Sequence, residues 1–66
     1  MAVDELQLVA QARAAMLMRG FDPLRVEVGP QTNRALGPAI SADGVLLDMP
    51  VTVRSDMEGF RVVPAD

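Results

Sequence analysis

Apolar residues recur at helical spacing along the first twenty residues of the chain, and capping signals stand at both ends of this stretch. Asp4 is a natural N-cap residue, and Gln7 occupies the third helical position, as in a capping box. At the other end, Gly20 suits the left-handed conformation that closes a helix, and Pro23 prevents its continuation. The pattern therefore predicts a helix over residues 4–19.

The predicted helix is apolar on two sides. At 100° per residue, one broad apolar face, interrupted by Arg13, comprises Val3, Leu6, Val9, Ala10, Ala14, Met16 and Leu17. A second apolar strip on the opposite flank comprises Leu8, Ala12 and Ala15. Because a short sheet covers only one side of a helix, we expect the second strip to contact something outside the chain.

Three later segments alternate apolar and polar residues, as half-buried strands do, and they span residues 24–28, 51–54 and 60–63. The last two are joined by five residues that end in Gly59, which predicts a hairpin. Asp43-Gly44 is a turn signal and predicts a second, smaller hairpin between the apolar residues on either side of it.

Residues 31–39 show no strand period, although residues 30–36 suit one helical turn closed by Gly37. Together the elements predict an α+β fold in a single domain, residues 1–66, with one N-terminal amphipathic helix packed on a small antiparallel sheet of three to five short strands.

The composition limits how so short a chain is stabilised. Its 66 residues include no Cys and no His, which excludes disulfides and removes the preferred ligands of a structural zinc ion. A core of this size is marginal on its own. We therefore expect the chain to bind a protein partner or further copies of itself.

The charges disfavour two other kinds of partner. The net charge is −3, and the six bases are all Arg, scattered among nine acids rather than gathered in a stripe. A nucleic-acid backbone needs such a stripe, so we expect no nucleic acid to bind. No apolar run is long enough to cross a membrane, and no basic signal region opens the chain. We expect a protein that is cytoplasmic or incorporated into a virion.

The sequence contains few of the residue types that usually carry out catalysis. Without His or Cys, acid–base work falls to carboxylates and nucleophilic attack to hydroxyls without an imidazole beside them. The sequence therefore predicts no enzyme and no cofactor. One alternative is a calcium site formed by Asp43, Asp48, Asp56 and Glu58, although these acids lack EF-hand spacing and are typical of turns and a solvated loop.

Two sets of residues are candidates for contact with a partner. The first is the second helix strip together with a neighbouring thioether, and comprises Leu8, Ala12, Ala15 and Met18. The second lies in the long connection over residues 29–44, between two Gly-Pro pairs, and comprises Gln31, Asn33 and Arg34.

These features favour a non-catalytic protein-binding or assembly subunit of a larger complex, for instance a phage virion accessory protein that decorates a capsid or acts as a connector. The alternative is a small regulatory inhibitor or adaptor that binds one enzyme reversibly, through residues 31–34 and Arg25. A third class is a ligand- or metal-binding module.

Overall fold

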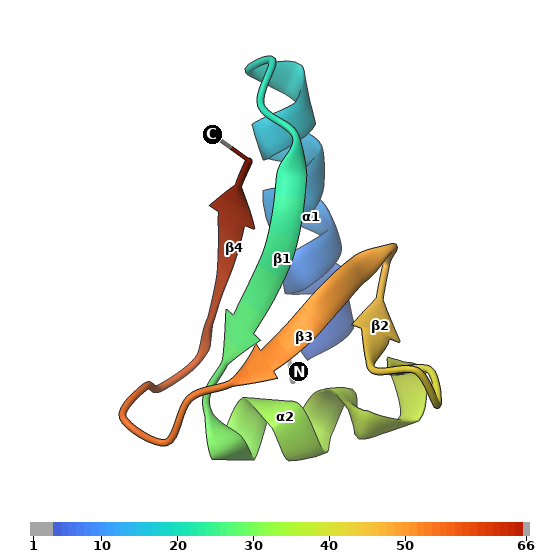
Figure 1. Ribbon diagram of the computed structural model, residues 1–66, viewed down its shortest axis with the longest axis vertical. Coiled ribbons are helices and arrows are strands. Elements are labelled where there is room, and N and C mark those ends of the chain that lie inside the picture. Colours follow the sequence, from blue (N-terminus) through green and yellow to red (C-terminus); the bar gives the residue numbers. More distant parts are fainter. Residues whose placement is uncertain (1–3, 66) are drawn as a thin grey trace.

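The structure, a computed structural model, describes residues 4–65, and within them the chain forms an α+β fold of two helices and one sheet (Figure 1). The helices are α1 (Glu5–Met18) and α2 (Pro30–Leu36), and α2 is followed by one 3₁₀ turn, η1 (Gly37–Ala39). The strands are β1 (Pro23–Val28), β2 (Val45–Leu46), β3 (Met49–Val53) and β4 (Phe60–Pro64).

The helix predicted for the start of the chain is present, with Asp4 as its N-cap and Gly20 in the left-handed conformation after its end, as expected. The Asp4 carboxylate accepts a hydrogen bond of 3.0 Å from the backbone N–H of Leu6. At the other end Gly20 has a φ of +85°, and the N–H of Phe21 donates to the carbonyl oxygen of Met16 over 3.1 Å. Local sequence alone therefore defines both ends of α1.

The sheet is mixed, so the prediction of a purely antiparallel sheet is wrong. The strand order is β2-β3-β1-β4, in which β1 is parallel to β3 and antiparallel to β4, and β2 is antiparallel to β3. The reason lies between β1 and β3, where α2 forms a crossover long enough to return the chain to the same end of the sheet. The prediction of a single helix is also wrong, whereas the helical turn considered for residues 30–36, closed by Gly37, is present as α2.

The hairpin predicted between residues 51–54 and 60–63 is wrong in its pairing. Both segments are strands, but they lie on opposite sides of β1 instead of side by side (Figure 1). Residues 54–59 pass over the end of β1, where the N–H of Arg54 donates to the carbonyl of Val28 and the N–H of Gly29 donates to the carbonyl of Gly59, each over 2.8 Å. Alternation identifies a half-buried strand without identifying its neighbour.

The smaller hairpin is displaced from Asp43-Gly44 to Leu47-Asp48. Gly44 has a φ of +76° and closes a turn with Ser41, but the residues before that turn form η1 and no strand. The hairpin is instead β2-β3, with Leu46 opposite Met49, and its two-residue turn consists of Leu47 and Asp48.

This turn holds two non-glycine residues in the left-handed region, with φ of +49° at Leu47 and +64° at Asp48. Positive φ at both central residues is the requirement of a type I′ turn, which Asn-Gly meets at least cost. We expect the double variant Leu47→Asn, Asp48→Gly to raise the free energy of unfolding by about 1 kcal/mol. Urea unfolding followed by circular dichroism measures this, and an unchanged or lower midpoint contradicts it.

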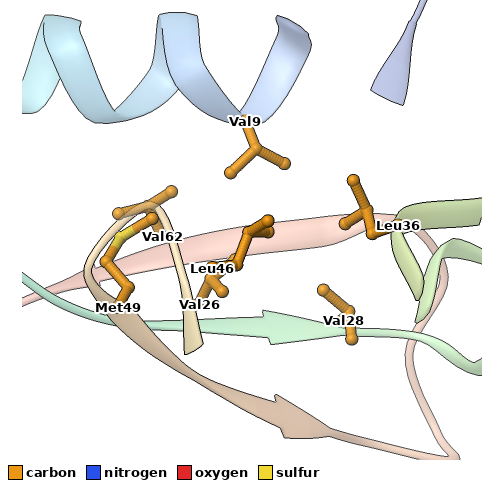
Figure 2. Packing of buried hydrophobic residues seen from close by; sticks show 7 residues of the cluster. All are labelled: Val9, Val26, Val28, Leu36, Leu46, Met49 and Val62. Carbon is orange, nitrogen blue, oxygen red and sulfur yellow. The ribbon is translucent and has the colours of Figure 1, made fainter. Parts of the chain in front are cut away.

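The hydrophobic core lies between α1 and the face of the sheet that carries Val26 and Val28 (Figure 2). Val9 projects from α1 toward the sheet, and α2 and β2 cover the remaining part of the core. The buried apolar side chains among the described residues are Val9, Val26, Val28, Leu36, Leu46, Met49 and Val62. All four strands and both helices therefore contribute to one small core.

The face of α1 that meets the sheet is narrower than the broad face predicted for it. Val9 is fully buried, and Leu6, Ala12 and Met16 pack beside it. Ala14 and Leu17 were expected to belong to the buried face but are exposed, with Leu17 at 44%. A helix that is apolar nearly all round does not fix its own rotation, so the sheet decides which stripe is buried. Val3, which was assigned to the same face, lies outside the described residues.

Candidate functional site

The residues of α1 that were proposed to contact a partner lie mainly at the surface. Leu8 is 37% exposed, Met18 is 88% exposed, and Ala15 is also exposed. Ala12 is half-buried because it packs against the core. We call Leu8, Ala12, Ala15 and Arg19, which share one side of the helix, the α1 flank.

An apolar groove of about 410 Å³ adjoins the α1 flank where the last turns of the helix meet the end of β4. Its walls are formed by Ala12, Ala15, Met16, Arg19, Phe21 and Pro64. Phe21 stands at the end of the groove with about half of its surface exposed. The groove places an exposed aromatic ring beside small helical side chains, as at many protein contacts.

The α1 flank runs along β4. Glu5, in the first turn of α1, lines a second hollow together with Glu58 and Gly59, which directly precede β4. Arg19, just after the helix, shares the groove with Pro64, the last residue of β4. The helix and this strand therefore run in the same direction, and β4 is an edge strand of the sheet.

The second set of proposed contact residues lies on α2. Gln31 and Arg34 are exposed and line the hollow near Glu5, which has a volume of about 640 Å³, whereas Asn33 is half-buried. These residues sit near the start of α1, while Ala15 and Met18 belong to its end (Figure 1). Ala15 and Met18 therefore lie apart from the α2 residues, whereas Leu8 lies one helical turn after Glu5, which lines the same hollow as Gln31 and Arg34.

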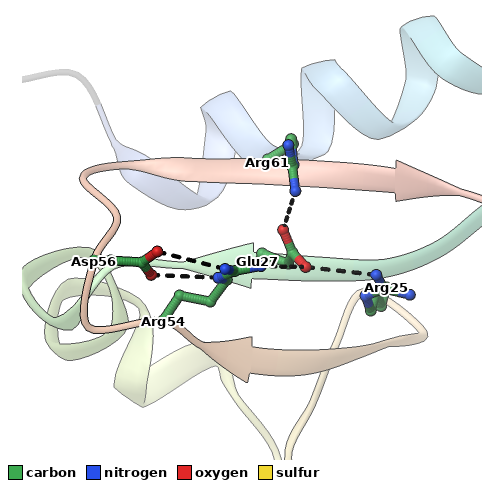
Figure 3. Close-up of polar contacts among 5 residues, drawn as sticks. All are labelled: Arg25, Glu27, Arg54, Asp56 and Arg61. Carbon is green, nitrogen blue, oxygen red and sulfur yellow. Dashed lines mark hydrogen bonds and ion pairs between the residues drawn. The ribbon is translucent and has the colours of Figure 1, made fainter.

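A charged cluster that sequence reasoning missed lies on the other face of the sheet (Figure 3). Its centre is Glu27 on β1, which is only 3% exposed. Its carboxylate oxygens lie 2.5 Å from Nη2 of Arg61, 3.5 Å from Nη2 of Arg25 and 3.7 Å from Nη1 of Arg54. Arg54 also pairs with Asp56 at 3.4 Å.

The register of the strands explains this cluster. Val26 and Val28 point into the core, so Glu27 between them points to the opposite face. Glu27 lies opposite Arg61 on β4 and opposite Thr52 on β3. The alternation of apolar and polar residues predicts that these side chains point away from the core. Their convergence depends on the order of the strands in the sheet, which the sequence of a single strand does not reveal.

The arginines keep the acids of the cluster ionised. A hydrogen bond from Arg61 is the main cause that lowers the pKa of Glu27, and the charges of Arg61, Arg54 and Arg25 act in the same direction against the effect of burial. Hydrogen bonds from Arg54 likewise lower the pKa of Asp56. Glu27 is therefore suited to hold arginine side chains in place and unsuited to donate or accept a proton near neutral pH.

This arrangement predicts that Glu27 makes stability depend on acid pH. The ordinary pKa of its carboxyl is 4.5, and the folded-state pKa lies below it, so the stabilisation is complete above 4.5 and is lost as the pH falls through the folded value. We expect the urea midpoint to fall less between about pH 5 and about pH 3 in Glu27→Gln than in the unmodified chain. Arg61→Leu removes the main cause of the lowered pKa of Glu27, so it should also weaken the dependence of the urea midpoint on pH. Equal slopes for all three chains contradict this account.

Within residues 4–65, no three acidic side chains lie close enough together to hold a metal ion. In the same described part of the chain, no helix has the length and apolar character needed to cross a membrane. Comparisons with protein family models, with characterised proteins and with solved structures give no match to this chain.

Proposed function

We propose that the chain is a non-catalytic protein-binding module that serves as an assembly subunit of a larger complex. One observation carries the proposal. Ten of the fourteen residues of α1 are apolar, and five of these are exposed, namely Leu8, Ala14, Ala15, Leu17 and Met18. An apolar helix surface left in water is typical of an interaction site, because a contiguous patch of this kind is uncommon on proteins that act alone.

The location of the exposed residues supports this proposal. Leu8 and Ala15 lie on the α1 flank, and the groove beside them contains Phe21, so the apolar surface continues from the helix to the edge of the sheet. Exposed Met18 extends this apolar surface at the end of the helix. A partner that covers this surface adds apolar burial to a small core, which is the stabilisation that a chain without disulfides needs.

The charged cluster around Glu27 is not arranged for acid–base catalysis near neutral pH. The acid with the lowest exposure, Glu27, is held as a carboxylate by arginines, and the chain has neither His nor Cys to work beside it. These features support binding as the function.

The assembly subunit and its alternative, a regulatory inhibitor or adaptor, make different demands on the free chain. A phage virion accessory protein, such as a capsid-decorating or connector protein, is expected to associate as it is made and to stay associated. A regulatory inhibitor or adaptor is expected to remain a folded monomer until it meets its enzyme. The size of the isolated chain over a range of concentrations distinguishes the two forms.

Photo-crosslinking in the cells that make the protein tests the proposed contact surface. A crosslinking residue is placed at Ala15 on the α1 flank or, as a control, at exposed Leu17, which points in a direction about 160° away. We expect a discrete crosslinked product from position 15 and none from position 17. No product from position 15, or the same products from both positions, overturns the proposal.

A further inference from the structure

The backbone of β4 has unused pairing capacity. Among the described strands, β4 has a single neighbour, β1. The carbonyl of Gly59 and the N–H of Ala65 both bond toward the β1 side, over 2.8 and 2.7 Å. Because these groups alternate along an antiparallel strand, Arg61 and Val63 also bond inward, and the N–H and carbonyl groups of Phe60 and Val62 point away from the sheet.

We propose that a second copy of this chain pairs with β4, so that two sheets join edge to edge around a two-fold axis at Val62. This inference rests on the proposed function and names the partner of the same surface. An open strand edge binds another extended strand. When two copies of one strand pair around a two-fold axis, they run antiparallel.

The sequence of β4 suits pairing with itself. Centred on Val62, the pairing places Val62 opposite the partner's Val62 and Phe60 opposite the partner's Pro64. Four hydrogen bonds follow, because each Val62 N–H meets a Val62 carbonyl and each Phe60 N–H meets a Pro64 carbonyl. Pro64 has no N–H, so each Phe60 carbonyl has no partner in this pairing and stays open to water. Arg61 lies opposite the partner's Val63, so like charges are not directly opposed.

The same symmetry brings the two α1 flanks together. Each helix runs along its own β4, so the two helices become antiparallel neighbours on one face of the joined sheet. The small side chains of Ala12 and Ala15 permit a close approach, and Leu8 gains an apolar partner. The antiparallel arrangement also directs Arg19, after the end of one helix, toward the partner's Glu5 in the first turn of the other. The backbone hydrogen bonds, the apolar contacts and the charge pair therefore all favour a second copy of the chain as the partner.

Sedimentation velocity over a range of concentrations tests the pairing with two matched variants. Leu8 and Leu17 lie on opposite sides of α1, and both are exposed, at 37% and 44%. We expect the unmodified chain to form a species of twice the 7.1 kDa chain mass. Leu8→Glu should raise the dissociation constant about a hundredfold, because each dimer buries two changed sites, whereas Leu17→Glu should change it less than about threefold. Circular dichroism confirms that both variants fold.

Amide hydrogen exchange distinguishes strand pairing from helix contact alone. We expect the N–H groups of Phe60 and Val62 to exchange at least about tenfold more slowly in the dimer than in the Leu8→Glu monomer. The inference is overturned if the chain stays monomeric, if Leu8→Glu leaves the dimer intact, or if these two amides exchange equally fast in both forms. A monomer that still crosslinks from Ala15 to a different protein overturns the self-pairing and leaves the proposed function standing. A monomer without that product overturns both.

Discussion

Gly29→Ala is expected to lower the free energy of unfolding by about 3 kcal/mol. Gly29 has an ordinary φ of −76°, so backbone strain is not the cause. A Cβ at this position would overlap the carbonyl oxygen of Met57 and would lie 3.0 Å from its carbonyl carbon and 3.2 Å from Cα of Glu58. All three are main-chain atoms of the segment that passes over the end of β1, and they cannot rotate away as a side chain does. A domain of this size has about 3 to 10 kcal/mol of stability in total, so the variant should lose between about a third and all of it.

Gly37→Ala is the matched control. Gly37 has a right-handed helical conformation, with φ of −46° and ψ of −47°, and a Cβ there would meet no atom within 4 Å apart from those of its chain neighbours. The following Pro38 disfavours a helical residue that carries a Cβ, and this strain offsets the entropy that alanine removes from the unfolded chain, so we expect a change of less than about 1 kcal/mol. Urea unfolding of both variants makes the comparison. Equal stabilities for the two would show that residues 54–59 do not press against Gly29.

Leu46→Ala is the second substitution for which we expect a large effect. It should lower the free energy of unfolding by about 2 to 5 kcal/mol. Leu46 lies on the two-residue strand β2 and is fully buried in the core with Met49 and Val9. Truncating its side chain removes apolar burial and leaves a cavity, because strand β2 and the turn after it are too short to collapse into the space.

The neighbouring residue, Leu47, supplies the control for this substitution. It is exposed at the tip of the turn and retains the same positive φ whether it is leucine or alanine. We expect Leu47→Ala to change the free energy of unfolding by less than about 0.5 kcal/mol. If Leu46→Ala and Leu47→Ala lower the free energy of unfolding by the same amount, β2 does not cover the core.

Local signals in the sequence were sufficient for α1 and for the position of the main strands. Asp4 and Gly20 act within one turn of the helix they bound, so their effect does not depend on the rest of the fold. The alternation in residues 24–28 likewise needs only a core on one side. Such features are predictable because their causes lie within a few residues of each other.

The pairing of the strands depended on contacts distant in the sequence and was predicted wrongly. Residues 54–59 have the length of a hairpin loop, but Gly29 permits them to cross β1, so β3 and β4 are separated by that strand. The cluster around Glu27 escaped prediction for the same reason, since Arg61 becomes its neighbour only through this crossing. Three arginines that are scattered along the chain therefore meet on one face.

The candidate contact surface was partly predictable. An excess of apolar residues around α1 is visible in the sequence, and Leu8 and Ala15 are exposed in the structure. The rotation of the helix was not predictable, because Ala12 and Ala14 have equivalent side chains and only the sheet determines that Ala12 packs inward. The open edge of β4 beside this flank depends on the strand order, which the sequence pattern does not contain.

The native mass of the protein, as recovered without denaturation from the cells that make it, tests most directly whether the apolar side of α1 is a contact surface. A partner or second copy bound there would give a species heavier than the 7.1 kDa chain, and the Leu8→Glu substitution would return it to the mass of the free chain. A protein that occurs only as a stable 7.1 kDa monomer, with or without that substitution, would contradict the account.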